Sequence, residues 1–261
     1  MVTASLNSTD ASAVAPRLSL QCEQIADDTV TIRSLDWDRS RFDIEFGLRN
    51  GTTYNSFLVR GERTALIDTS HAKFRDTWIP LLQEQIDPKA IDVLIVSHTE
   101  PDHSGLIGDL LELNPDVEIV ASKVAIQFLE NQVHRPFKSR AVKSGEELDL
   151  GINPESGVHH RFEFLSAPNL HWPDTIFSFD HGSGILYTCD AFGLHYCSDA
   201  IFDSDPGAIA PDFRFYYDCL MGPNARSVLQ ALKRMDSLPA INTIAVGHGP
   251  LLREHLQHWI S

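Results

Sequence analysis

Residues 91–103 read IDVLIVSHTEPDH, in which an apolar run leads directly into a string of potential metal ligands. The run at residues 91–96 predicts a strand that is buried on both faces of a sheet. Because Pro101 interrupts any helix there, we expect the string to form a loop at the strand end, where metal ligands collect on rigid scaffolds. An isolated pair of histidines would favour a polar surface loop, but this density of ligand types favours a metal site. The four potential ligands are His98, Glu100, Asp102 and His103.

Three further potential ligands occur in matching positions later in the chain, at His171, Asp190 and His248. Asp190 follows the predicted strand at residues 185–188, and His248 follows the predicted strand at residues 243–246. Taken singly, each is more often a cap or a surface residue. Together, strand-end residues of these types predict that the strand ends converge and that the side chains bind one metal centre.

Short apolar strands alternate with amphipathic helices in both halves of the chain. This alternation predicts an α/β protein in which two sheets pack together with helices outside them. We expect strands at residues 29–34, 54–59, 64–67, 91–96, 117–120, 162–165, 175–179, 185–188 and 243–246. We expect helices at residues 74–86, 104–113, 123–132 and 203–238, with breaks in the last at Pro211 and Gly222-Pro223, and a closing helix that begins at Pro250.

The 261 residues carry 21 basic and 36 acidic side chains, which gives a formal net charge of −15. Such a charge repels nucleic acid and anionic lipid, so we expect neither as a partner. The sequence has no apolar run near the roughly 20 residues that a transmembrane helix needs. Four cysteines without a Cys-x-x-Cys pair favour reduced thiols in a cytoplasmic protein. The composition of residues 1–17 predicts a disordered tail, and residues 18–261 have the length of one domain.

The order of the potential ligands resembles that of the flavodiiron proteins, a redox branch of the metallo-β-lactamase superfamily. Both have His-x-Glu-x-Asp-His followed by His, Asp and His, and the likeness is carried by residues 97–105, 170–174 and 247–250. Wider stretches, such as residues 34–47 and 218–236, resemble the branch found in oxygenic phototrophs. The resemblance covers nearly the whole chain after the tail. It implies a metallo-β-lactamase-like αβ/βα four-layer sandwich.

The resemblance also implies a centre of two non-haem irons and a role for each potential ligand. One iron is implied to bind His98, Glu100 and His171. The other iron is implied to bind Asp102, His103 and His248. Asp190 is implied to bridge the two irons. The implied reaction is reduction of O2 to water, with reduction of NO to N2O as a second possibility.

The residue at position 100 separates redox chemistry from hydrolysis. Zinc hydrolases of the superfamily usually have histidine there, and imidazole-rich sites suit zinc. Glu100, with Asp102 and Asp190, makes a harder and more anionic site that stabilises ferric iron. Two alternatives stay open at this point. One is a binuclear metal-dependent hydrolase, in which a bridging hydroxide attacks an ester, thioester or lactam, and the other is a non-catalytic metal-binding subunit of a hetero-oligomer.

The source of electrons lies outside the motifs in this sequence. Flavodiiron proteins normally continue into a flavodoxin-like domain that binds FMN, and the phototroph branch adds a flavin reductase domain. This sequence has no Gly-rich phosphate loop between a strand and a helix, so we expect no FMN site in it. The resemblance implies a diiron core, either a fragment or an engineered truncation. Such a core takes electrons from NAD(P)H or ferredoxin through FMN, within a homodimer or heterodimer.

Two residues outside the ligand set are secondary candidates. Asp68 ends the predicted strand at residues 64–67, where it can hydrogen-bond a ligand histidine from behind or cap the next helix. His195 follows Asp190 closely. The remaining histidines have no ligand context, and we expect most of them to face solvent: His71, His134, His159, His160, His181, His255 and His258.

Overall fold

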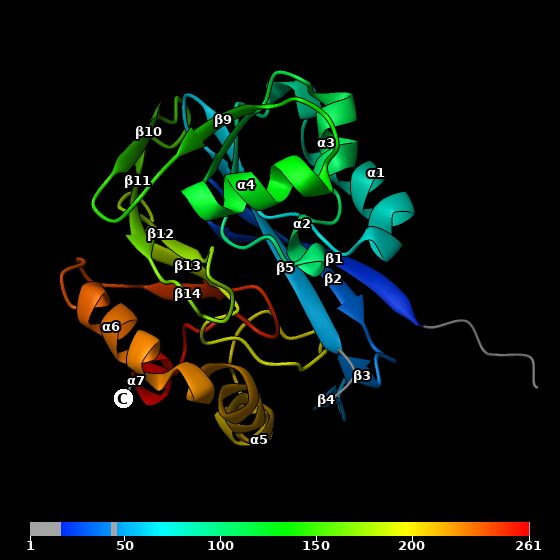
Figure 1. The fold of residues 1–261 in the computed structure, drawn as a ribbon, viewed down its shortest axis with the longest axis vertical. Helices are drawn as coiled ribbons and strands as arrows, with labels where there is room; N and C mark the ends of the chain where they lie inside the picture. The colour runs from blue at the N-terminus through cyan, green and yellow to red at the C-terminus, as the bar shows by residue number, and fades with distance from the viewer. Residues whose placement is uncertain (1–16, 43–45, 261) are drawn as a thin grey trace, which may run out of the picture.

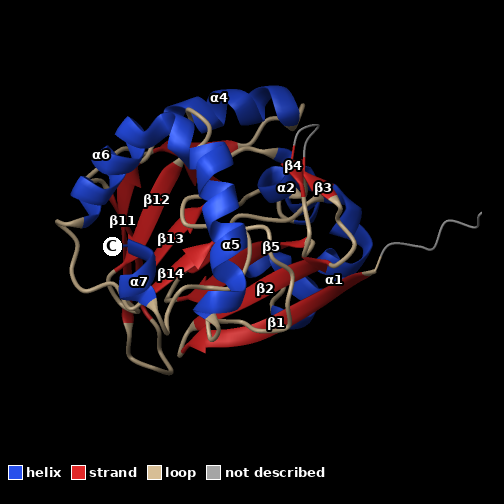
Figure 2. Cartoon of the chain, turned by 90° about the horizontal axis from the view of Figure 1, so that it is seen from below, coloured by secondary structure: helices blue, strands red, loops and turns tan. Residues whose placement is uncertain are grey.

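The computed structural model describes residues 17–42 and 46–260, which form two β-sheets packed face to face with helices outside them (Figure 1 and Figure 2). The first sheet has seven strands in the order β1-β2-β5-β6-β7-β8-β9. The second sheet has five strands in the order β10-β11-β12-β13-β14. This arrangement confirms the predicted four-layer sandwich. The expected disordered tail lies, through residue 16, outside the described residues.

Parallel strand pairs set the edge at which the potential ligands meet. The first sheet contains β1 (Leu18–Ala26), β2 (Thr29–Asp36), β5 (Thr52–Arg60), β6 (Thr64–Ile67), β7 (Val93–Val96), β8 (Glu118–Ala121) and β9 (Lys138–Ala141). The second contains β10 (Glu147–Ile152), β11 (His159–Ser166), β12 (Ile176–Asp180), β13 (Ile185–Cys189) and β14 (Thr243–Val246). A separate short pair is β3 (Arg41–Phe42) with β4 (Phe46–Gly47). Because β6 runs parallel to β7, and β13 parallel to β14, the carboxyl ends within each pair share one edge.

The helices form the two outer layers. In the first half they are η1 (Ala72–Phe74), α1 (Arg75–Gln85), η2 (Pro88–Ala90), α2 (Pro101–Ser104), α3 (Ile107–Leu113) and α4 (Lys123–Gln132). In the second half they are α5 (Pro206–Tyr216), a π-helical turn η3 (Tyr217–Met221), η4 (Gly222–Asn224), α6 (Ala225–Met235) and α7 (Leu256–Ile260). Among the described residues, no helix is both long enough and apolar enough to span a membrane.

Strand β7 shows how the sequence divides the interior into two cores. Its residues alternate between the faces of the sheet, so Val93 and Ile95 belong to the core between the two sheets. Leu94 and Val96 belong to the core beneath the helices of the first half. All four side chains are fully buried, which confirms the predicted strand with two buried faces. The loop that follows is therefore fixed at one end by packing on both sides.

Three expectations about prolines are wrong. Pro101 opens the short helix α2, because a first helical position needs no backbone N–H. Pro211 lies inside α5, where its ring removes a single bond to the carbonyl of Gly207 near the helix start. Pro250 does not open the closing helix, because the next residues pair with residues 202 and 244 in isolated bridges. The expected break at Gly222-Pro223 is confirmed by the turns η3 and η4.

Three edge strands, β1, β9 and β10, were absent from the expected set, as was the short pair of β3 and β4. The residues of β1 are largely exposed or half-buried, and all four residues of β9 are exposed. Neither strand shows the apolar run of a buried strand, because each lies at an edge of the first sheet. Sequence patterning therefore located the central strands better than the edges.

Candidate metal centre

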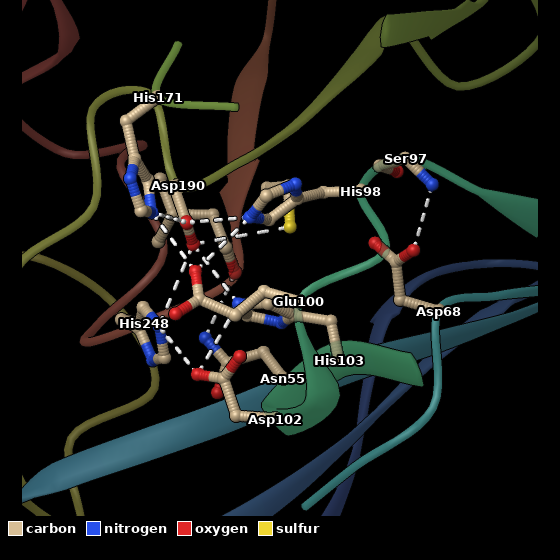
Figure 3. A network of polar contacts seen from close by, with 12 residues as sticks. Asn55, Asp68, Ser97, His98, Glu100, Asp102, His103, His171, Asp190 and His248 are labelled. Carbon is tan, nitrogen blue, oxygen red and sulfur yellow. Dashed lines mark hydrogen bonds and ion pairs between the residues drawn. The ribbon is translucent and has the colours of Figure 1, made fainter. Parts of the chain in front are cut away.

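The structure brings all seven predicted ligand residues together near the carboxyl ends of strands β7, β11, β13 and β14 (Figure 3). Four come from the segment after β7, which continues into α2. His171 comes from the loop between β11 and β12, Asp190 directly follows β13, and His248 follows β14. Side chains from both sheets thus meet in one buried cluster.

The first donor group contains His98, Glu100, His171 and one oxygen of Asp190. Glu100 Oε2 lies 3.2 Å from His98 Nε2 and 2.9 Å from His171 Nε2. Asp190 Oδ2 lies 3.4 Å and 3.1 Å from the same two nitrogens. The donor atoms of this group all lie within 4.8 Å of one another.

The second donor group contains Asp102, His103 and His248, and the other oxygen of Asp190 lies beside its two histidines. Asp102 Oδ2 lies 3.2 Å from His248 Nε2 and 3.6 Å from His103 Nε2. Asp190 Oδ1 lies 2.9 Å from His103 Nε2 and 3.4 Å from His248 Nε2. One carboxylate therefore faces both groups, each with a different oxygen, which is the geometry of a bridging ligand.

The spacing between donors fits metal coordination. Nitrogen and oxygen ligands at about 2.0–2.2 Å from a first-row metal lie about 3.0–3.5 Å from one another when their bonds meet near 90–110°. The observed separations of 2.9–3.6 Å span that range. Both carboxylate oxygens of Asp102 and both ring nitrogens of His103 are buried without a well-aligned hydrogen bond. Because such groups are costly to leave unsatisfied, the cluster fits a pair of cations.

The pKa shifts of the cluster also indicate a site for cations. Burial opposes charge on Asp190, yet His103 and His171 hold the pKa of its carboxyl well below the ordinary value. Burial likewise opposes charge on His98, but Asp174 and Glu100 raise the pKa of its imidazole to about 9. The carboxylates thus stabilise positive charge inside the cluster, which is the charge that metal ions supply.

Residues behind the donors hold the imidazole rings in place. Asp174 Oδ1 lies 3.3 Å from His98 Nδ1, and its other oxygen accepts bonds from the backbone N–H and hydroxyl of Thr99. The Nδ1–H of His248 donates to the carbonyl of Thr53 at 2.6 Å, which leaves Nε2 free to bind a metal. Sequence reasoning missed both partners, because neither lies at the end of an apolar strand.

The loop that carries His248 is attached to the first sheet through Asn55 (Figure 3). The amide of Asn55 donates to the carbonyls of Val246 and Gly249, each at 2.9 Å, and its backbone N–H donates to Gly247. A Cβ at Gly247 would lie 2.7 Å from Cε1 of His103, so only glycine allows this approach.

Asp68 does not bond a ligand histidine in the structure. Its carboxylate accepts the backbone N–H of Ser97 at 2.8 Å, one residue before His98 (Figure 3). Burial raises the pKa of Asp68 to about 6, while His103 and the bond from Ser97 act in the opposite direction. Asp68 thus supports the start of the ligand loop, and Asp174 takes the position behind the histidine that was one of the two roles considered for Asp68.

The histidines outside the ligand set divide into two kinds. His195 is buried beside the cluster, with its ring centroid 4.7 Å from that of His248 and its Nδ1 2.9 Å from the Thr52 hydroxyl. His160 was expected among the solvent-facing histidines, but it is buried between Asp28 and Asp180. His134, His159, His255 and His258 are exposed, as expected, and His71 and His181 are half-buried.

Comparisons with known proteins agree with this geometry. The model of the family described as "ODP family beta lactamase" matches residues 52–249. A putative diflavin flavoprotein A 1 of Nostoc sp. PCC 7120 is 62% identical over 253 residues, which cover 97% of this chain and 43% of that protein. This chain therefore spans less than half the length of that relative.

Two solved structures share the fold. The metal-soaked Flv1 flavodiiron core from Synechocystis sp. PCC6803 superposes with a TM-score of 0.85 at 33% identity, over 94% of this chain and 62% of that chain. The rubredoxin oxygen:oxidoreductase from Desulfovibrio gigas superposes with a TM-score of 0.85 at 28% identity, over 92% of this chain and 60% of that chain. The comparisons and the buried cluster of histidines and carboxylates agree with a diiron site of the flavodiiron kind.

Proposed function

Because this chain belongs to the ODP family of β-lactamase folds, as the metallo-β-lactamase-like core of a flavodiiron protein, we propose that it is the oxygen-reducing part of that enzyme. The proposed reaction is the reduction of O2 to water, with NO as a second acceptor. Support for oxygen comes from the similar Desulfovibrio gigas protein, which is named for its reaction with oxygen. The proposed reaction is that of a whole flavodiiron enzyme, and this chain spans 43% of the length of the Nostoc diflavin flavoprotein.

We assign the ligands by the two donor groups. His98, Glu100 and His171 would hold one iron, and Asp102, His103 and His248 would hold the other. Asp190 would bridge them, since each of its oxygens faces one group. When bound, two irons supply redox chemistry that zinc does not, because zinc has no accessible change of oxidation state.

The position of Glu100 carries this proposal. Its carboxylate lies within 3.2 Å of two histidine nitrogens and adds a third negative charge to those of Asp102 and Asp190. Hard anionic oxygen donors favour iron and stabilise its higher oxidation state, whereas imidazole-rich sites suit zinc. The side chain of His171 is 16% exposed, more than those of the other six residues, so solvent reaches the cluster on that side.

The protein residues organise the site rather than supply electrons. Reduction of O2 to water takes up electrons and protons together, and an iron pair does not accept hydride from a nicotinamide. A flavin must therefore stand between NAD(P)H or ferredoxin and this centre. We propose FMN on a flavodoxin-like domain, in a homodimer or heterodimer, as that donor.

Metal analysis combined with single-turnover oxidation tests the proposal. Protein expressed in iron-supplemented medium should bind iron in both donor groups, and the dithionite-reduced protein should be reoxidised by O2 in a stopped-flow experiment. Protein that binds zinc under the same conditions and hydrolyses esters or lactams would instead support a binuclear hydrolase. Protein that binds metal but is neither reoxidised by O2 nor active as a hydrolase would support a non-catalytic metal-binding subunit.

A further inference from the structure

An apolar cavity lies between the second sheet and helices α5, α6 and α7. Its volume is about 560 Å³. The outer wall comes from α6, where Val228 and Leu232 line the space and Leu229 is 67% exposed at the mouth. The inner wall includes residues of the chain segments that carry the metal donors.

Three residues of the inner wall adjoin the candidate metal centre. Leu170 directly precedes His171, and Ala191 directly follows Asp190. Tyr216 lines the same cavity and is 3% exposed, with its ring centroid 6.2 Å from that of His248. The cavity therefore extends from the surface of α6 to the layer of side chains next to the donors.

The chemistry of the walls selects against polar ligands. Arg214 is the charged side chain in the lining, and its guanidinium is bound to Asp218 at 2.8 Å. The indole N–H of Trp259 donates to Asp203 at 2.7 Å. Sites for polar small molecules need converging donors or acceptors, and the side chains of this lining are otherwise apolar apart from the hydroxyls of Tyr216 and Tyr217. A pocket with apolar walls that opens to the surface beside the exposed Leu229 favours apolar guests, such as xenon, over polar ones.

We propose that this cavity binds small, weakly polar diatomic gases and delivers them to the metal centre past Leu170, Ala191 and Tyr216. The proposal deepens the proposed function, on which it rests, by naming where its substrate enters. O2 and NO concentrate in apolar surroundings because they forfeit little hydration there. Anions and other polar oxidants gain nothing from such a path, so they must use the solvent side near His171.

Xenon provides a test that is independent of iron. Crystals of the chain pressurised with xenon should show xenon in the cavity lined by Val228 and Leu232. Val228→Phe should fill the space and displace the xenon, whereas Gln230→Phe on the exposed side of α6 should leave it in place. Absence of xenon from the cavity of the unaltered chain would overturn the proposal.

Reoxidation kinetics test delivery to the centre. In iron-loaded, pre-reduced protein, Val228→Phe should slow reoxidation by O2 several-fold and leave reoxidation by ferricyanide unchanged, with Gln230→Phe as the matched control. Equal O2 rates in the unaltered chain and Val228→Phe would overturn the gas path. If the unaltered chain is not reoxidised by O2 at all, the proposed function fails, while the xenon result still decides whether the cavity binds gas.

Discussion

Asp174 lies directly behind His98, with Oδ1 3.3 Å from the histidine Nδ1, on the side of the ring opposite the donor cluster. Both side chains are fully buried. The contact determines which ring nitrogen carries the proton, because a carboxylate beside Nδ1 keeps a hydrogen there and leaves Nε2 to bind a metal.

We expect Asp174→Asn to weaken metal binding by about 10–100-fold, the usual effect of losing a carboxylate behind a ligand histidine. Competition with a metal chelator of known affinity measures this change. Asp180→Asn is the matched control, because Asp180 is an equally buried carboxylate beside His160, remote from the donor cluster. Equal loss of metal in both variants would show that burial of the carboxylate, and not its contact with His98, is responsible.

Asp190 and Asp68 should differ in their effect on metal content. Asp190→Ala removes donors from both groups at once, so we expect loss of most bound metal from purified protein. Asp68→Ala removes only the bond to the Ser97 backbone, so metal should be retained with reduced affinity. Metal content by elemental analysis, with circular dichroism as a check on folding, compares the two. A similar loss in both variants would mean that Asp190 does not bridge.

Glu100→His should change which metal the centre prefers. The substitution replaces a hard anionic donor by imidazole and lowers the negative charge of the first donor group. We expect the iron-to-zinc ratio of protein grown with equal supplies of the two metals to fall several-fold. Glu130→His, on the exposed face of α4, is the control. An unchanged ratio in Glu100→His would remove the main reason for preferring redox chemistry to hydrolysis.

The buried contact of Asp28, His160 and Asp180 should make stability depend on pH. Burial lowers the pKa of His160, but Asp180 and Asp28 outweigh it and raise that pKa above 6.5. The contribution of His160 to the free energy of unfolding is therefore fully present below pH 6.5. It is lost as the pH rises through the raised pKa that His160 has in the folded protein. Burial raises the pKa of Asp180, but the contact with His160 outweighs burial, so the pKa is lowered. The contribution of Asp180 to the free energy of unfolding is therefore present above pH 3.8 and is lost as the pH falls through the lowered pKa of the folded protein.

Denaturant unfolding of the unaltered chain and His160→Gln measures this contribution. Near pH 6 the substitution should cost about 1–3 kcal/mol, the usual penalty for leaving a buried partner unsatisfied. The difference in unfolding free energy should shrink as pH is raised toward 9. His159→Gln, the exposed neighbour, should show little change. A difference that stays constant with pH would mean that His160 is neutral in the folded protein.

The donor residues were predictable because each follows an apolar run, and strand ends in a two-sheet fold meet at one edge. The role of Asp174 was not predictable, because Asp174 lies in an irregular loop before β12 and contacts a histidine 76 residues away in the chain. The burial of His160 was predictable from the sequence pattern of its strand. His160 alternates with Phe162 and Phe164 along β11, and all three side chains are buried on the same face. Its partner Asp28 lies 132 residues away, which no local pattern reveals.

Electron supply gives the last prediction. Iron-loaded, flavin-free protein of these 261 residues should not consume O2 with NADH or NADPH, although it should be reoxidised once after chemical reduction. The reason is chemical: a nicotinamide gives up hydride, and a cluster of buried histidines and carboxylates has no group that accepts hydride and passes on electrons singly.

Adding a flavodoxin-like domain with FMN, together with its flavin reductase, should restore turnover at the oxygen electrode. Asp190→Ala in the same reconstituted mixture should abolish the added rate, which separates turnover at the metal centre from direct oxidation of free flavin. Steady NAD(P)H oxidation by the purified, flavin-free chain would contradict the view that it is the oxygen-reducing part of a larger flavoprotein.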